Sequence, residues 1–196
     1  MKRLFDFVVS AFGLLILLPF FIVLAILIVL DSRGGIFYKQ KRVGKDNRDF
    51  FLYKFRSMHT DADKKGLLTV GGRDPRITRI GYFIRKFKID ELSQLINVLK
   101  GDMSLVGPRP EVRKYVNLYT PEQLKVLHVK PGITDPASIA YFDENELLAK
   151  AKDPEKTYIE EIMPAKLKLN LEYIDRASLY YDLKIIIKTI GKIFAK

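Results

Sequence analysis

Two adjacent carboxylates, Asp90 and Glu91, stand where basic residues are dense on both sides, and this pattern could bind phosphate. Six basic residues precede the pair: Arg73, Arg76, Arg79, Arg85, Lys86 and Lys88. Arg109 follows between Pro108 and Pro110, in a stiff loop that suits bidentate contact between a guanidinium group and a phosphate. The pair also opens a predicted helix, and the N–H groups and dipole of a helix N-terminus attract anions. The alternative is that the arginines form a solvated, lipid-facing patch.

The role of Asp90 depends on where its side chain points. On a structural interpretation, Asp90 caps the helix and Glu91 complements the helix dipole in the first turn. On a functional one, Asp90 points into a cationic pocket as a metal ligand or as a nucleophile, since a carboxylate can attack phosphorus and form an acyl phosphate. Mg²⁺ would bind such a carboxylate together with water and would neutralise phosphate oxygens. The pair by itself does not choose between these interpretations.

Composition limits the partners of the chain. It has 196 residues, a formal net charge of +11 and no cysteine, so disulfides and thiolate metal sites are excluded. A basic chain favours polyanions, namely nucleic acid, anionic lipid headgroups or phosphorylated substrates. His59 and His128 lack zinc-ligand spacing, and the sequence has no P-loop, GxGxxG, GxSxG or nucleic-acid-binding motif. We therefore expect lipid and phosphate, and no nucleic acid, as partners.

The chain is organised around an uncharged run of 24 residues, Phe7–Leu30, of which 19 are Leu, Ile, Val or Phe. Such a run predicts a membrane-embedded element, because a soluble domain rarely needs a helix that is apolar all round. The alternative is a fully buried core helix. Pro19 divides the run and predicts a kink. Basic residues flank both ends, which suits a helix that enters and leaves by the same face, but composition alone also permits a spanning helix.

Periodicity and turn residues predict the remaining elements. Ile36–Val43 and Phe50–Arg56 form a predicted hairpin around a turn at residues 44–47. Arg79–Phe87 is basic and aromatic on separate faces, which is typical of a membrane-interface helix and equally of an ordinary surface helix. Asp90–Lys100 has clear helical periodicity. Thr60–Asp74 is a predicted loop, and Gly101–Pro110 cannot form long regular structure, because Gly107–Pro110 breaks it. The other predicted helices are Glu111–Tyr119, Pro121–Val129 with Thr120 as cap, Glu144–Ala151, Tyr158–Ile174 with a break at Pro164, and the basic amphipathic Leu179–Ala195.

The stretch KIDELSQLINVLKGDMSLVGPRP, Lys88–Pro110, strongly resembles the signature of the bacterial sugar transferase family, the monotopic phosphoglycosyl transferases of glycoconjugate assembly. The likeness extends to Gln40–Ala62, Lys130–Thr134 and Ser178–Ile190, and so covers nearly the whole chain in order. The chain looks like the minimal catalytic form, without the extra N-terminal spans of longer members. The resemblance implies transfer of a phospho-sugar from a UDP-sugar to polyprenol phosphate, such as undecaprenyl phosphate, with release of UMP. This would be the first membrane step of polysaccharide, O-antigen or glycoprotein glycan synthesis.

The resemblance also implies roles for particular residues. Asp90 matches the nucleophile and Mg²⁺ ligand of the family, and Glu91 matches a residue that assists metal binding or proton handling. The expected phosphate-binding residues are Arg85, Arg109 and Lys54. Two other interpretations of the same residues stay open. In one, the enzyme joins both substrates directly and Asp90 only holds magnesium; in the other, the chain is a non-catalytic membrane scaffold that binds anionic lipid.

A fold and a location follow from the same resemblance. It implies an α+β, mostly helical protein with a re-entrant membrane helix–break–helix at residues 1–32, broken at Pro19. A catalytic domain at residues 33–196 would lie on the cytoplasmic face of the inner membrane, with a small β-hairpin and with interfacial amphipathic helices around the active site. The implied partners are a UDP-sugar, polyprenol phosphate and the lipid bilayer. A homodimer is compatible with the sequence, which does not fix the oligomeric state.

Three positions depart from the family pattern. Leu18 stands where many members have a serine before the proline, so a hydroxyl that could satisfy backbone carbonyls is missing. Asn170 stands where an acidic residue is common. Asp135–Ser138 differs in a loop expected to shape the choice of sugar or nucleotide. The sequence therefore does not reveal which sugar is transferred or in which pathway.

Overall fold

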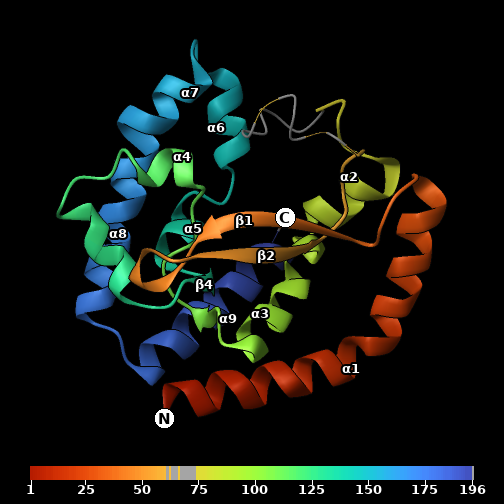
Figure 1. Ribbon diagram of the computed structural model, residues 1–196, viewed down its shortest axis with the longest axis horizontal. Coiled ribbons are helices and arrows are strands. Elements are labelled where there is room, and N and C mark those ends of the chain that lie inside the picture. The colour runs from red at the N-terminus through yellow and green to blue at the C-terminus, as the bar shows by residue number, and fades with distance from the viewer. Residues whose placement is uncertain (61, 63–65, 67–73, 196) are drawn as a thin grey trace.

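The computed structural model describes residues 1–60, 62, 66 and 74–195 and confirms an α+β fold that is mostly helical. A long N-terminal helix runs along one side of a domain made of a β-hairpin, a short parallel strand pair and shorter helices (Figure 1). The predicted loop Thr60–Asp74 lies largely outside the described residues.

The strands are β1 Phe37–Val43, β2 Asp49–Phe55, β3 Ser104–Val106 and β4 Gly132–Thr134. The α-helices are α1 Lys2–Asp31, α2 Arg79–Lys86, α3 Leu95–Lys100, α4 Arg113–Val116, α5 Pro136–Ala140, α6 Glu144–Lys150, α7 Pro154–Thr157, α8 Met163–Asp175 and α9 Leu179–Phe194. Further helical segments are the 3₁₀ turns η1 Lys45–Asn47, η3 Ile89–Gln94 and η4 Gln123–His128 and the π-helical η5 Tyr158–Ile162.

Helix α1 is continuous and bends near its middle (Figure 1). The predicted break at Pro19 is therefore a bend within one helix, not a gap between two helices. Pro19 removes one backbone donor and crowds the preceding turn, which is enough to bend a helix. The other backbone hydrogen bonds persist, and they keep the two arms helical.

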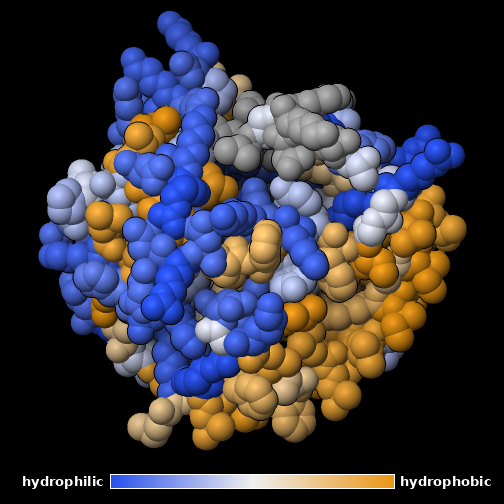
Figure 2. All heavy atoms as spheres, viewed as in Figure 1, coloured by the Kyte–Doolittle hydropathy of each residue, from blue (hydrophilic) through white to orange (hydrophobic). Residues whose placement is uncertain are grey.

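Most of the surface of α1 is apolar and exposed. Its only buried residues are Asp6, Ser10, Leu24 and Ile28. Figure 2 shows hydrophobic residues gathered along the lower and right edges of the molecule, where α1 runs. Within the described part of the chain, α1 is the one helix that is long and apolar enough to cross a membrane. A core helix would be covered by protein, so the core-helix alternative is wrong, and the exposed face indicates association with a membrane.

Polar contacts fasten the start of α1 to the domain. Lys2 Nζ lies 2.6 Å from Asp182 Oδ2 of α9 and donates to the Tyr173 hydroxyl of α8 at 3.0 Å. Tyr173 donates in turn to Asp182 Oδ1 at 2.6 Å. One turn further along, Asp6 is buried and accepts a hydrogen bond from the Ser104 hydroxyl at 2.8 Å. The first turns of the membrane helix are thus held by three separate elements of the domain.

The end of α1 is fastened to the same domain by other residues. The Arg56 guanidinium, just after β2, donates to the carbonyls of Ile28 at 3.1 Å and Ser32 at 2.6 Å. These carbonyls belong to the last turn of α1, where a cation is favoured. Asp31 Oδ2 accepts from the backbone N–H of Ile80 at 2.9 Å, in the first turn of α2. Both ends of the apolar helix therefore meet one domain.

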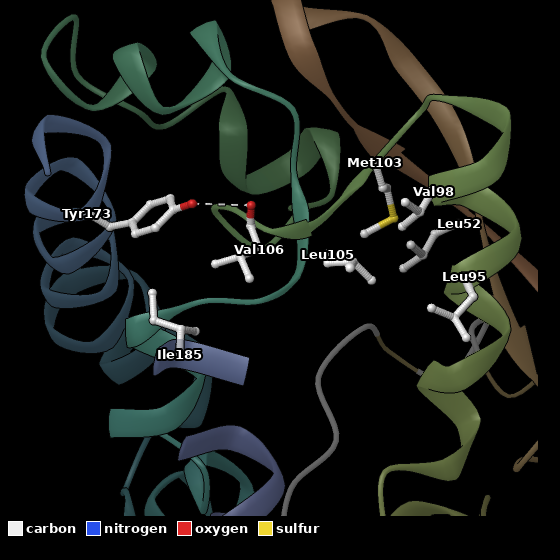
Figure 3. Packing of buried hydrophobic residues seen from close by; sticks show 8 residues of the cluster. All are labelled: Leu52, Leu95, Val98, Met103, Leu105, Val106, Tyr173 and Ile185. Carbon is white, nitrogen blue, oxygen red and sulfur yellow. Dashed lines mark hydrogen bonds between the residues drawn. The ribbon is translucent and has the colours of Figure 1, made fainter. Parts of the chain in front are cut away.

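The strands confirm the predicted hairpin and add a short parallel pair. β1 and β2 pair antiparallel, with Phe37 opposite Phe55, as expected for the predicted hairpin. β3 and β4 pair in parallel, with Ser104 opposite Gly132. The three residues of β3 agree with the prediction that Gly101–Pro110 holds no long regular structure, although the strand itself was not predicted. One core cluster joins these strands to helices from both halves of the chain (Figure 3): Leu52, Leu95, Val98, Met103, Leu105, Val106, Tyr173 and Ile185.

The predicted helices at Arg79–Phe87, Glu144–Ala151 and Leu179–Ala195 are confirmed as α2, α6 and α9. Others differ in extent or type. Within the predicted helix Glu111–Tyr119, only the four residues of α4 are α-helical. The predicted helix Pro121–Val129 contains the 3₁₀ segment η4 instead of an α-helix. Pro164 causes no break, because it lies in the first turn of α8, where its missing donor is tolerated after the π turn η5.

Asp182→Ala should loosen the attachment of α1. It removes the acceptor shared by Lys2 and Tyr173, so we expect a loss of about 1–3 kcal/mol in the free energy of unfolding. For a chain of this size that loss lowers the unfolding midpoint by roughly 2–4 °C per kcal/mol, measurable by thermal unfolding in detergent. Asp175→Ala, at an exposed position of α8, is the matched control and should change the midpoint little. Equal effects of the two changes would contradict the attachment.

Candidate active site

Asp90 and Glu91 lie where two short helices are joined. The Thr78 hydroxyl caps α2 by accepting a hydrogen bond from the Gly81 N–H at 3.0 Å. After α2, Lys88 adopts a left-handed conformation, with φ 56°, and turns the chain into η3. Asp90 and Glu91 occupy the first turn of η3, which leads directly into α3. Lys88, not Asp90, takes the cap position, so the capping interpretation of Asp90 is wrong.

The carboxyl group of Asp90 is buried with one oxygen unsatisfied. The residue is 4% exposed, and its Oδ1 has no hydrogen-bond partner among the described residues. Its Oδ2 lies 3.9 Å from Lys54 Nζ, near the end of β2. Burial raises the pKa of Asp90, and the neighbouring Lys54 opposes that rise. A buried, unsatisfied carboxyl oxygen is costly in a folded protein, and it marks Asp90 as a candidate for contact with a ligand.

The neighbouring carboxylate, Glu91, is already fully engaged. Arg109 donates from Nη1 to Oε2 at 2.9 Å and from Nη2 to Oε1, which makes a bidentate ion pair. Lys54 Nζ lies 3.4 Å from Oε1. Burial alone would raise the pKa of Glu91, but Arg109 and Lys54 outweigh burial and hold the pKa well below its usual value. The two carboxylates are therefore distinct: Glu91 orients cations, and Asp90 keeps an oxygen available.

A cavity of about 460 Å³ lies beside this pair. Its basic side chains come from the hairpin, α2, the turn before η3, the loop after β3 and α8: Lys54, Arg85, Lys88, Arg109 and Lys166. Much of the remaining wall is aliphatic: Leu92, Leu95, Leu105, Ile133, Ile139, Ile186, Ile190 and Ile193. The last three belong to α9, whose residues Ile187 and Phe194 are exposed on the surface. The cavity thus combines cations with an apolar wall and suits an anionic group attached to an apolar chain.

All of the predicted polar site residues line this cavity: Lys54, Arg85, Asp90, Glu91 and Arg109. Pro19 lies in the membrane helix and takes no part in it. Other arginines of the predicted basic run before Asp90 are not among the described residues that line the cavity. Arg76 pairs with Asp74 at 2.6 Å, outside the cavity, and Arg73 lies outside the described residues.

Sequence reasoning missed the contribution of α6 and α8. Asn145 and Lys166 line the cavity, and Lys166 Nζ lies 2.6 Å from Glu144 Oε2. These residues are more than fifty positions away from Asp90 and belong to no local motif. Only the packing of α6 and α8 beside the Arg109 loop brings them to the site, so no signal in the sequence could have placed them.

The whole chain, residues 1–196, matches the family model described as bacterial sugar transferase. The protein therefore belongs to the bacterial sugar transferase family.

Curated relatives agree with this assignment. The chain is 39% identical over 195 residues to a UDP-N-acetylgalactosamine-undecaprenyl-phosphate N-acetylgalactosaminephosphotransferase of Aeromonas hydrophila, which covers 98% of this chain and 43% of the relative. It is 35% identical over 198 residues to the UDP-glucose:undecaprenyl-phosphate glucose-1-phosphate transferase of Escherichia coli K12, covering 99% of this chain and 40% of the relative. It is 54% identical over 110 residues to a putative undecaprenyl-phosphate N-acetylgalactosaminyl 1-phosphate transferase of Bacillus subtilis, covering 56% of this chain and 62% of the relative. The chain thus spans less than two thirds of the length of each of these relatives.

Arg109→Gln should destabilise the protein by about 3 kcal/mol, because it leaves the buried charge of Glu91 without its main partner. This value is at the lower end of the range of about 3–5 kcal/mol for breaking a buried ion pair, because the Arg109 side chain is 29% exposed. Combining this change with Glu91→Gln should cost about 1–3 kcal/mol less than the sum of the single changes. Equilibrium unfolding of the four proteins in detergent measures this coupling, and strictly additive losses would contradict the ion pair.

Proposed function

We propose that the protein is a phosphoglycosyl transferase that moves a phospho-sugar from a UDP-sugar to polyprenol phosphate and releases UMP. The observation that carries the proposal is Asp90: it is buried, its Oδ1 lacks a partner among the described residues, and it lines a cavity that is partly cationic and partly aliphatic. The names of the relatives, which pair UDP-sugars with undecaprenyl phosphate, support these substrate classes. The reaction would be the first membrane step in the synthesis of a bacterial polysaccharide, O-antigen or glycoprotein glycan.

The proposed chemistry has two displacements at one phosphorus atom. In the first, a carboxylate oxygen of Asp90 attacks the β-phosphorus of the UDP-sugar. The bond from that phosphorus to the bridging oxygen breaks, and UMP leaves with the electron pair. In the second, a phosphate oxygen of the polyprenol phosphate attacks the phosphorus of the acyl phosphate. The Asp90 carboxylate is then regenerated, and a polyprenyl-diphospho-sugar is formed.

Basic residues support both displacements in this proposal. Lys54, Arg85 and Arg109 line the cavity and would contact the phosphate oxygens, where positive charge stabilises the transition state. Glu91 acts as a positioning residue, because its oxygens hold the Arg109 fork and lie near Lys54. Its strongly lowered pKa keeps it ionised and makes it a poor proton donor, so we assign it no proton transfer.

The donor set at Asp90 fits Mg²⁺. No group of three or more His, Cys, Asp or Glu side chains that could hold a metal occurs in the described ranges, so the protein supplies few ligands. Mg²⁺ suits such a site, because it keeps several waters and binds one or two carboxylates together with substrate phosphate. Asp90 would hold it through its unsatisfied carboxyl group, whereas the oxygens of Glu91 are engaged by Arg109. Bound magnesium would neutralise negative charge on the phosphate oxygens.

We further propose that α1 is re-entrant and that the rest of the chain lies on the cytoplasmic face of the membrane. Lys2 and Asp6 bind the domain at the start of α1, and Arg56 and Asp31 bind it at the end. A helix that spans the bilayer could not keep both sets of contacts with one domain. The bend at Pro19 lets the helix dip into the bilayer and return. The many basic residues of the domain favour the cytoplasmic side.

The apolar wall of the cavity gives the acceptor a route from the bilayer. α9 lines the cavity with Ile186 and Ile190 and exposes Ile187 on its other side. α2 likewise exposes Tyr82 and Phe83. Two helices with exposed apolar residues and many lysines and arginines are suited to lie in the membrane interface. There they would hold the cationic part of the cavity level with lipid headgroups.

Asp90→Asn should abolish release of UMP from UDP-sugar in the presence of polyprenol phosphate and Mg²⁺. The amide is nearly the same size but is a far weaker nucleophile, so we expect activity to fall by at least about 10³-fold. Intact mass spectrometry of the wild type with donor alone should detect a phospho-sugar adduct that disappears in Asp90→Asn. Lys125→Ala, at an exposed position outside the cavity, is the control.

Initial-rate kinetics with both substrates separate the remaining alternatives. Ping-pong patterns support the covalent intermediate, whereas sequential patterns with no adduct would support direct joining of the substrates. If the wild type released no UMP from any UDP-sugar, a scaffold that binds anionic lipid would be the better description.

Single-cysteine labelling tests the course of α1, because the natural chain has no cysteine. One cysteine is inserted after Met1, and in a second protein Arg33→Cys places it at an exposed position beyond the helix. We expect a membrane-impermeant maleimide to reach both thiols only from the cytoplasmic side of sealed vesicles. Pro19→Leu should remove the bend and shift part of the N-terminal thiol to the opposite side. Labelling of the two wild-type positions from opposite sides would contradict the re-entrant course.

A further inference from the structure

A second cavity, of about 170 Å³, adjoins the one that holds Asp90. The two cavities share four residues in their walls: Arg109, Glu144, Asn145 and Lys166. Asn170 lines the second cavity only and comes one helical turn after Lys166 on α8, so both side chains face the same way. Arg109 therefore stands between a cavity that suits phosphate and a second, smaller one.

Each charged side chain of the second cavity has an ion-pair partner, and the partner of Arg109, Glu91, belongs to the Asp90 cavity. Arg42 Nη1 lies 2.9 Å from Glu111 Oε1, and Glu111 also accepts a hydrogen bond from the Tyr158 hydroxyl. Lys166 pairs with Glu144 at 2.6 Å, and Arg109 pairs with Glu91. The wall has three basic and two acidic side chains, and because all five are in ion pairs it offers polar contacts with little uncompensated charge. It suits a neutral ligand rich in hydrogen-bonding groups better than an anion.

The wall of the second cavity also contains a buried amide oxygen, that of Asn170, without a hydrogen-bond partner among the described residues. The residue is 4% exposed. Leaving a buried amide oxygen unpaired costs free energy, and a ligand hydroxyl or N–H would recover it.

A third cavity, of about 420 Å³, differs in charge. It shares Lys54 and Arg85 with the Asp90 cavity, and Arg42, Arg56 and Arg76 also line it. No carboxylate occurs among the described residues of its wall. Arg42 and Arg76 pair with Glu111 and Asp74, which lie outside this wall, so the charged groups on the described part of the wall itself are all basic. Such a wall suits an anion, which in a nucleoside diphosphate sugar is the nucleotide half with its second phosphate.

We infer that the second cavity binds the sugar ring of the donor and that the Asn170 amide oxygen accepts a hydrogen bond from a hydroxyl or acetamido N–H of that ring. The inference rests on the proposed transferase function. The β-phosphate of the donor is bonded directly to the anomeric oxygen, so the sugar must lie immediately beside the phosphate that Arg109 contacts. The cavity on the other face of Arg109, with its paired charges and unsatisfied amide, meets that requirement.

Asn170→Leu tests this assignment, because it keeps the approximate volume and removes the amide. UMP release is measured with a panel of UDP-hexoses that differ at C2 and C4, and UDP is measured as a competitive inhibitor that lacks the sugar. We expect kcat/KM for the preferred donor to fall about 3- to 10-fold, the effect of one lost neutral hydrogen bond. The donor that lacks the recognised group should lose less, so the ratio between donors should change. Inhibition by UDP should stay the same.

Two further variants make the result decisive. Asn145→Ala, on the shared wall, should also change the ratio between donors, and it decides the question if thermal unfolding shows that Asn170→Leu does not fold. Ile190→Ala, in the aliphatic wall of the Asp90 cavity, should raise KM for polyprenol phosphate and leave the donor ratio unchanged. An active wild type whose donor ratio is unchanged in both asparagine variants overturns the sugar subsite and leaves the transferase function standing. A wild type that releases no UMP from any donor overturns both.

Discussion

The bidentate ion pair between Arg109 and Glu91 makes two neighbouring carboxylates chemically unequal. Two buried acids side by side would otherwise repel each other, and both would tend toward the neutral form. Arg109 removes that conflict by engaging both oxygens of Glu91, and the proximity of Lys54 adds to the effect. Asp90 is left with an oxygen that no described residue satisfies. The prolines on either side of Arg109 stiffen its loop, so the difference between the two acids is built into the backbone.

The membrane helix and the cavity depend on the same supporting elements. α9 carries Asp182, which binds Lys2 at the start of α1, and one turn later Ile186, which lines the cavity. The end of β2 carries Lys54, and Arg56 follows two residues later to bind the last turn of α1. Because single elements reach both the anchor and the cavity, the depth of α1 in a bilayer fixes the height of the cavity. In the proposed transferase, membrane anchoring and substrate binding therefore depend on the same elements.

Sequence patterns could predict features that rest on local rules. Nineteen strongly apolar residues in 24 predicted α1, and β-branched and aromatic residues on both sides of a turn predicted the hairpin. The dense basic residues around Asp90-Glu91 pointed to side chains that the structure brings to one cavity. Features that depend on tertiary contacts could not be predicted from the sequence. Ser104–Val106 is a three-residue strand whose partner lies 28 positions away, so it has no detectable period. Asp90 was open to interpretation as a cap because η3 begins with the left-handed turn at Lys88, which no propensity marks.

For the proposed transferase, the charge of the cavity favours binding of the two proposed substrates one after the other. Five basic side chains line it, Lys54, Arg85, Lys88, Arg109 and Lys166, against three acidic ones, Asp90, Glu91 and Glu144. The difference is two positive charges. A UDP-sugar brings about two negative charges at neutral pH, and a phosphate monoester brings about 1.5–2 more. The cavity can balance one of these substrates but not both, since unpaired charge in a partly buried site is costly. Departure of UMP before the polyprenol phosphate binds removes the excess, and a covalent bond to Asp90 is what would hold the phospho-sugar during the exchange.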